Sequence, residues 1–449
     1  MNFIKKIFSF SCLTASLFLL IYTFYKSEIH YNGEKSDYYF TYYVVSSVFI
    51  LFSIITFFIS DKIKEYLIIS CLSLTVSLYI FEGYFSLNSQ PPQAKIYEKE
   101  TGKKWDSRQR TEIYRDLKKI NNNIKVTVHP SYFLNKNTNI FPLSGISNSE
   151  TIYCNESGYF SIYQSDRYGF NNPDEEWDSK EVEYLLVGDS MVQGACVNRP
   201  NDIGSVLRII SNKSVLNLGY GGNAPLTQYA TLREYLKPNV KKVLFSYVDN
   251  DSGGLVKEIN AKNKILENYL NDLTFTQNLI LRQKEVDIIG NDIIQKEYTK
   301  IKKEKELKFL KLNYIREKLN SYLPEKYRPY ENYRLTPLPA EEFKRVLKLT
   351  KDLTSQNNSE LYFVYLPLCE RYKTKVKGCY YKKGEYDDSN YQLLKKIVNE
   401  LDIPFVDIHT EVFLKQKNPT KLFPFELNKH YNVEGFEKTA KGIYKLTRD

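Results

Sequence analysis

The chain has 449 residues, enough for one large or two ordinary domains, and 15% of them are aromatic. This aromatic content allows a packed core and excludes a predominantly disordered chain. The formal net charge is +10. No dense arginine cluster or nucleic-acid motif accompanies that charge, so we expect no nucleic-acid partner. The basic balance is weakly favourable for anionic glycans or lipid headgroups.

Three apolar stretches near the N-terminus are each close to the length of about 20 residues that a helix needs to cross a bilayer. They run over residues 7–25, 40–60 and 66–87. Lys5 and Lys6 favour a cytoplasmic N-terminus, although Lys26 and Lys35 in the first loop weaken this orientation. We therefore predict a multi-pass anchor in the inner (cytoplasmic) membrane over residues 1–90, with the C-terminal domain exported.

Four of the six cysteines lie in the predicted exported part: Cys154, Cys196, Cys369 and Cys379. They allow three disulfide connectivities, one of which closes the short loop between Cys369 and Cys379 and leaves Cys154 with Cys196. No C-x-x-C pair has the spacing of a zinc site, so we expect no metal, and nothing in the sequence calls for a cofactor.

Residues 184–187 are four apolar residues that run directly into Gly188, Asp189 and Ser190. This pattern predicts a buried strand of a parallel sheet that ends in a tight turn. Ligands of open α/β sheets bind just beyond the carboxyl ends of the strands, so Ser190 is a candidate nucleophile. Because Gly, Asp and Ser are also ordinary turn residues, the motif alone does not separate the two interpretations.

Four further apolar segments have the same form and alternate with segments of helical periodicity. They cover residues 214–219, 242–248, 360–366 and 403–407. The alternation predicts an α/β domain with a parallel five-stranded sheet over residues 181–449. Residues 91–180 are then a linker and an N-terminal extension. The charged helical segment at about 257–335 is an insertion that serves as a lid, a partner platform or a solvated helical pair.

The ends of three predicted strands offer the groups that acyl transfer to a serine needs. A tetrahedral intermediate requires fixed hydrogen-bond donors, and the candidates are the backbone N–H groups of Ser190 and Gly222 and the side-chain amide of Asn250. A serine nucleophile also needs a base. Among the four histidines, His430 precedes a final amphipathic helix and can reach the strand ends, whereas His129 is assigned no role.

Taken in order, these segments resemble the sequence blocks of the SGNH hydrolase superfamily, also called GDSL esterases. The matching positions are residues 188–190, Gly222, residues 250–251 and His430. The resemblance extends over about residues 183–446, with the helical insertion in between. It implies a three-layer α/β/α sandwich in which Ser190 is the nucleophile, His430 the general base, and Gly222 and Asn250 donors to the oxyanion.

Two positions depart from the family pattern. Val248 stands where the third block usually has glycine, and Leu427 stands where the last block usually has the aspartate of the triad. The candidate acid partners of His430 are then Glu426, one position further from it, and Asp407, after the fifth strand. We expect a Ser–His dyad whose imidazole is held by a backbone carbonyl or by Glu426, because losing an orienting carboxylate slows a triad without abolishing catalysis.

These features together predict a membrane-anchored, exported serine esterase or O-acyltransferase. Its expected substrates are acyl esters, above all an acylated cell-surface glycan, and its oligomeric state is left open. One alternative is a non-catalytic SGNH-like module that binds glycan or assembles with an export machine, which the missing aspartate favours. Another is a lipid esterase, for which membrane anchoring is the only support.

Overall fold

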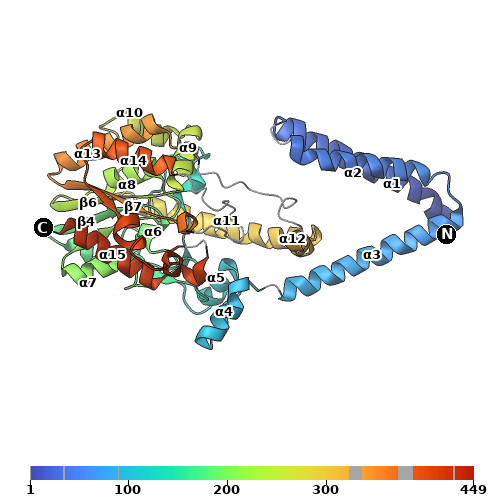
Figure 1. Cartoon of the computed structure of the whole chain (residues 1–449), viewed down its shortest axis with the longest axis horizontal. Coiled ribbons are helices and arrows are strands. Elements are labelled where there is room, and N and C mark those ends of the chain that lie inside the picture. The colour runs from blue at the N-terminus through green and yellow to red at the C-terminus, as the bar shows by residue number, and fades with distance from the viewer. Residues whose placement is uncertain are drawn as a thin grey trace. The chain divides into compact units, whose positions relative to one another are not determined.

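The computed structural model describes residues 2–33, 36–88, 90–322, 336–372, 388–427 and 430–448. The chain divides into two compact units (Figure 1). The smaller unit comprises residues 1–89 and 305–328, and the larger unit comprises residues 90–304 and 329–449.

The smaller unit is built from apolar helices: α1 (Asn2–Phe24), continued by a π-helical turn (Tyr25–His30), α2 (Ser36–Ile55) and α3 (Asp61–Asn88). Three spans are long and apolar enough to cross a membrane: Ile7–His30, Tyr38–Ile55 and Asp61–Leu87. Most of their side chains are not buried inside the protein, as helices that face lipid require. The helices are therefore compatible with the predicted membrane anchor.

The larger unit contains a five-stranded sheet in the order β5-β4-β6-β7-β8, and all neighbouring strands are parallel. The strands are β4 (Val182–Val187), β5 (Val215–Asn217), β6 (Val240–Val248), β7 (Glu360–Leu366) and β8 (Phe405–Asp407). The predicted parallel five-stranded sheet is confirmed. Parallel strands place their carboxyl ends at one edge, so the turns that follow β4, β5 and β6 can meet there.

Alternate residues of each strand pack into two separate cores, one on each face of the sheet. Leu185 of β4 and Phe245 of β6 belong to one core, whereas Leu186 and Leu244 belong to the other. Helices pack against both faces of the sheet, and the five named next contribute to the two cores, the first three to one face and the last two to the other (Figure 1). They are α8 (Pro225–Tyr235), α13 (Ala340–Gln356) and α14 (Ser389–Glu400), and α7 (Ile203–Ser211) and α15 (Val433–Thr447). The expected three-layer α/β/α arrangement is confirmed.

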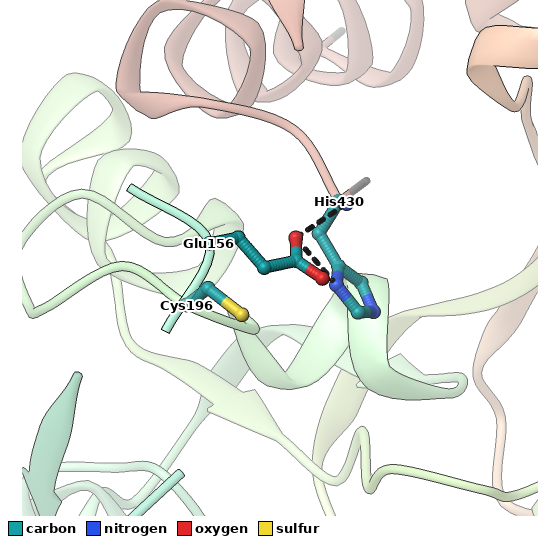
Figure 2. A group of neighbouring side chains, drawn as sticks. All are labelled: Glu156, Cys196 and His430. Atoms are coloured by element: carbon teal, nitrogen blue, oxygen red, sulfur yellow. Dashed lines mark hydrogen bonds and ion pairs between the residues drawn. The ribbon is translucent and has the colours of Figure 1, made fainter. Parts of the chain in front are cut away.

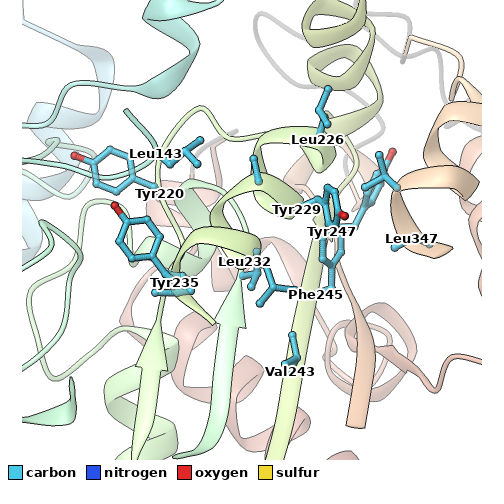
Figure 3. Close-up of a cluster of buried hydrophobic side chains, with 14 of the residues drawn as sticks. Leu143, Tyr220, Leu226, Tyr229, Leu232, Tyr235, Val243, Phe245, Tyr247 and Leu347 are labelled. Carbon is cyan, nitrogen blue, oxygen red and sulfur yellow. The ribbon is translucent and has the colours of Figure 1, made fainter. Parts of the chain in front are cut away.

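Aromatic side chains fill much of the first core. Figure 3 shows Tyr229 and Leu232 of α8 beside Val243 and Phe245 of β6, and all four are fully or almost fully buried. Burying an aromatic or leucine side chain contributes roughly 1.5–3 kcal/mol, so this packing fixes the strand ends that carry the polar turns.

A second, smaller sheet lies in the segment that precedes β4. Its strands are β1 (Ile124–Val126), β2 (Glu150–Ile152) and β3 (Ile162–Gln164), with β1 parallel and β3 antiparallel to β2. The remaining helices of the chain are α4 (Pro92–Thr101), α5 (Arg110–Lys118), α6 (Ser190–Gln193), α9 (Asp251–Asn260), α10 (Lys264–Asn271), α11 (Gln283–Leu310) and α12 (Asn313–Tyr322). The short 3₁₀ and π turns are Pro130–Phe133, Asp174–Asp178, Cys369–Tyr372, His409–Phe413, Pro419–Leu422 and Pro424–Glu426.

Candidate active site

The candidate nucleophile sits on a turn that is braced from two directions. Ser190 is the first residue of α6, directly after β4, and is half-buried. The Asp189 carboxylate caps this short helix by accepting a hydrogen bond from the backbone N–H of Met191 at 2.8 Å. The side chain of Gln193 accepts from the Gly221 N–H at 2.7 Å and so ties α6 to the loop after β5. Ser190 therefore rests on a rigid support.

His430 joins Ser190 to a carboxylate. Its Nε2 lies 2.9 Å from Ser190 Oγ, and its Nδ1 lies 3.1 Å from Glu156 Oε2, which also accepts the His430 backbone N–H at 2.8 Å (Figure 2). A carboxylate oxygen only accepts hydrogen bonds, so Nδ1 carries the proton. Nε2 is then left with a lone pair directed at the Ser190 hydroxyl, which is the arrangement that a general base needs.

The segment after His430 is itself fixed. The Tyr431 hydroxyl donates to the backbone oxygen of Pro367 at 2.8 Å, beyond the end of β7. The Asn432 side chain caps α15 by accepting from the Gly435 N–H at 2.9 Å. The imidazole is thus held from both sides, by a capped helix in sequence and by Glu156 in space.

The carboxylate beside the imidazole is not one of the two that the sequence suggested. Glu426 accepts hydrogen bonds from the hydroxyl of Thr420 at 2.7 Å and the amide of Asn418 at 3.2 Å. Asp407 accepts one from the hydroxyl of Tyr391 at 2.6 Å. The contact at Nδ1 of His430 is with Glu156, a residue that the sequence did not suggest, and it extends the expected Ser–His pair to a Ser–His–Glu run of contacts.

A disulfide explains how Glu156 reaches the site. Cys154 and Cys196 are bonded, one of the connectivities that the sequence allowed, across 42 positions of sequence. The bond joins the residues just before Glu156 to the loop that follows the helix of Ser190. The second pair of this connectivity is Cys369 with Cys379. Cys379 lies outside the residues that the structure describes.

Among the described residues, Glu156, Cys196 and His430 form a group that could hold a metal ion by geometry, since their ligand atoms lie within 4.8 Å of one another (Figure 2). The sulfur of Cys196 is bonded to Cys154 and offers no thiolate. The other two side chains are hydrogen-bonded to each other. We therefore assign no metal to this group.

The three candidate oxyanion donors line one cavity of about 370 Å³. Ser190 begins α6, Gly222 lies in the loop after β5, and Asn250 precedes α9 after β6. Gly222 has φ +80°, and an added Cβ would lie only 2.8 Å from the hydroxyl of Ser131 and 3.0 Å from Nδ1 of His129. Only glycine suits this position, because both the backbone conformation and the close approach exclude a side chain.

Three buried acids border the cavity, and their carboxylates accept hydrogen bonds from backbone N–H groups of the surrounding loops. Asp251 accepts from the Val248 N–H at 3.0 Å. Glu258 accepts from the N–H groups at the start of α8, which follows the Gly222 loop. Burial raises the pKa of Asp189, raises that of Asp251 well above its usual range, and raises that of Glu258 to about 7. Burial thus disfavours the ionised form of each of these three carboxyl groups.

His129, to which the sequence gave no role, packs beside the loop of Gly222. Its ring centroid lies 6.3 Å from that of Tyr153. Burial, reinforced by the charges of Arg110 and His430, lowers the pKa of His129 to about 4, so its ring is neutral at pH 7. Neither His129 nor Glu156 belongs to the sequence blocks, and the one sequence signal that pointed toward Glu156 was the pairing of Cys154 with Cys196.

No protein-family model matches the sequence, and no curated protein matches it. Several solved structures do match. A protein described as lipolytic and of the G-D-S-L family, from Desulfitobacterium hafniense DCB-2, aligns over 59% of this chain and 99% of its own, with 13% identity and a TM-score of 0.33. The acetyl xylan esterase AlAXEase aligns over 59% and 100%, with 10% identity and a TM-score of 0.32. The acetylxylan esterase Axe2 from Geobacillus stearothermophilus aligns over 60% and 95%, with 15% identity and a TM-score of 0.32.

These overall similarities are low, and the assignment of fold and site rests on the chain itself. Its four sequence blocks occur in the SGNH order; three of them follow strands of one parallel sheet, and the fourth, with His430, precedes α15. The chain thus resembles the SGNH hydrolases both in sequence order and in the fold that carries the blocks.

Proposed function

We propose that this protein is an SGNH-type serine esterase or O-acyltransferase, anchored in the membrane and with its larger unit exported, that acts on acyl esters of a carbohydrate. The observation that carries the proposal is the run of hydrogen bonds from Glu156 through His430 to Ser190. It ends at a cavity that Ser190 shares with two further candidate oxyanion donors.

In the proposed reaction, Ser190 Oγ attacks the ester carbonyl while its proton passes to Nε2 of His430. Glu156 stabilises the imidazolium that forms, and the donors at Ser190, Gly222 and Asn250 stabilise the negative charge on the carbonyl oxygen. Collapse of this intermediate breaks the ester C–O bond, and His430 gives the proton to the leaving alcohol. Water or a sugar hydroxyl then attacks the acyl-enzyme, with His430 again as base.

Two features support an exported carbohydrate ester as the substrate. Disulfides persist in oxidising compartments, and the Cys154–Cys196 bond lies next to the candidate catalytic residues. The cavity has the size of a small-ligand site and is bordered by polar groups such as Ser131, Asn223 and Thr336. A polar cavity of this size suits a sugar better than a long acyl chain.

The test is turnover of p-nitrophenyl acetate by the full-length protein in detergent. Ser190→Ala and His430→Ala are expected to lose more than about a thousandfold in kcat/KM. Ser355→Ala, an exposed serine of α13, is the matched control and should equal the wild type. Wild-type turnover that survives in Ser190→Ala would contradict the proposal. Adding an oligosaccharide and measuring transferred acetyl against free acetate then separates an acyltransferase from a hydrolase.

A further inference from the structure

The cavity beside Ser190 contains a cation without an acidic partner. Lys257, on α9, lines the cavity and has an exposed side chain. Within the described residues, no acid forms an ion pair with it. Many other basic side chains of this unit do have such partners, for example Arg108 with Asp106 and Arg208 with Glu176. A lysine at the rim of a cavity that forms no ion pair within the protein can bind an anionic group of a ligand.

The acids around the cavity do not neutralise this lysine. The carboxylates of Asp251 and Glu258 accept hydrogen bonds from backbone N–H groups, and that of Asp189 caps α6. Burial raises the pKa of all three carboxyl groups. Lys257 is the cation among the described residues that line the cavity.

The same cavity is bordered by an amide that the protein leaves unsatisfied. Asn223 follows Gly222 and is only 3% exposed. Neither its side-chain nitrogen nor its side-chain oxygen has a hydrogen-bond partner among the described residues. A buried amide without hydrogen-bond partners is destabilising, and native proteins rarely leave one in place. A polar ligand in the cavity would supply the missing partners.

A second unpaired cation lies on the His129 side of the site. Arg110, at the start of α5, is half-buried, and its charge acts on both His129 and Tyr153. It has no acidic partner in the part of the chain that the structure describes. The hydroxyl of Tyr153 is buried, only 4% of the residue being exposed, and it too lacks a hydrogen-bond partner among the described residues. An added Cβ on Gly221 would lie 2.6 Å from this hydroxyl, so the hydroxyl of Tyr153 borders the loop that contains Gly222.

We propose that the ester substrate is an anionic glycan, with carboxylate or phosphate groups near the ester, and that Lys257 and Arg110 recognise those groups. Asn223 and Tyr153 supply neutral hydrogen bonds beside the two cations. This inference rests on the proposed function, because it names the substrate class of the same site. A neutral glycan would leave both cations without a counter-charge, whereas an anionic polymer would supply one.

The test compares three acetylated probes on the full-length protein in detergent at low ionic strength: an oligogalacturonate for carboxylate, a glycerol-phosphate oligomer for phosphate, and a neutral xylo-oligosaccharide. We expect kcat/KM to be higher for one anionic probe than for the neutral probe. This ratio should fall as the salt concentration rises, because salt screens charge interactions. Lys257→Gln and Arg110→Gln should each reduce this preference about two- to fivefold through KM, as the loss of one exposed ion pair predicts. Lys264→Gln, an exposed lysine of α10 outside the cavity lining, is the charge-matched control and should leave the preference unchanged.

The outcomes separate this inference from the proposed function. Turnover of p-nitrophenyl acetate with no preference for either anionic probe, or a preference that both substitutions leave intact, overturns the inference alone. If no ester is turned over, binding of unacetylated oligogalacturonate and of glycerol-phosphate oligomer is measured by calorimetry. Binding of either probe that the double substitution abolishes then supports the anionic site without catalysis, and absence of binding overturns it.

Discussion

The substitution Glu156→Gln tests whether the carboxylate that the sequence missed orients and stabilises the base. Glu156 Oε2 lies 3.1 Å from Nδ1 of His430, with 14% of the glutamate side chain and 27% of the histidine side chain exposed. Two unit charges at that distance interact by about 5 kcal/mol at an effective dielectric constant of about 20. Solvent screens part of this interaction, and the glutamine side chain of the variant can still accept a hydrogen bond from Nδ1 of His430. We therefore expect the variant to lose about 2–4 kcal/mol of transition-state stabilisation.

That loss corresponds to a fall of about 30- to 1,000-fold in kcat, with KM little changed, because the charge matters only once the imidazolium forms. The assay is steady-state turnover of p-nitrophenyl acetate by the full-length protein, with circular dichroism to verify the fold. Glu426→Gln is the matched control, since it makes the same chemical change at a carboxylate that is hydrogen-bonded to Thr420 and Asn418. The reasoning is refuted if Glu156→Gln keeps kcat within threefold of the wild type, or if Glu426→Gln falls as far.

Three further outcomes are expected. Gly222→Ala should lower both turnover and melting temperature, because φ at this position is +80° and the new Cβ would have contacts near 3 Å. Wild-type turnover and melting temperature in this variant would show that the position tolerates a side chain. Cys154→Ser with Cys196→Ser should lower the unfolding free energy by about 4 kcal/mol, as expected for closing a loop of this length, and chemical denaturation with and without reductant measures it. The pKa of Glu258 is raised to about 7 by burial, so its contribution to stability is complete below about pH 4.5 and is lost as pH rises through 7. Glu258→Gln should therefore flatten the decline of stability between these values in denaturation curves, and an unchanged slope would exclude this residue as its cause.

The sheet was predictable because its evidence is local. Four of the five strands are mainly buried runs of apolar residues, and β4 and β6 lead into the polar turns at residues 188–190 and 249–251. Ser190, Gly222 and Asn250 follow three such strands, so the parallel topology alone brings them to one edge. His430 could be chosen because the chain has only four histidines and this one precedes the last helix.

Glu156 could not be found in this way because nothing local marks it. It belongs to no strand of the main sheet and follows β2 of a small sheet whose strands have three residues each. Its place depends on the pairing of Cys154 with Cys196, a contact between distant parts of the sequence. Cys196 lies shortly after Ser190, and Glu156 lies shortly after Cys154. Knowledge of the Cys154–Cys196 bond would therefore have placed Glu156 near the nucleophile. Sequence spacing to His430 pointed instead to Glu426.

Covalent labelling by a fluorophosphonate, followed by mass spectrometry of the intact protein and its peptides, tests whether Ser190 is an activated nucleophile. The account predicts one adduct per chain, located on Ser190, absent in Ser190→Ala and formed much more slowly in His430→Ala. A folded wild-type protein that takes up no label, or that carries the label at another residue, would contradict it.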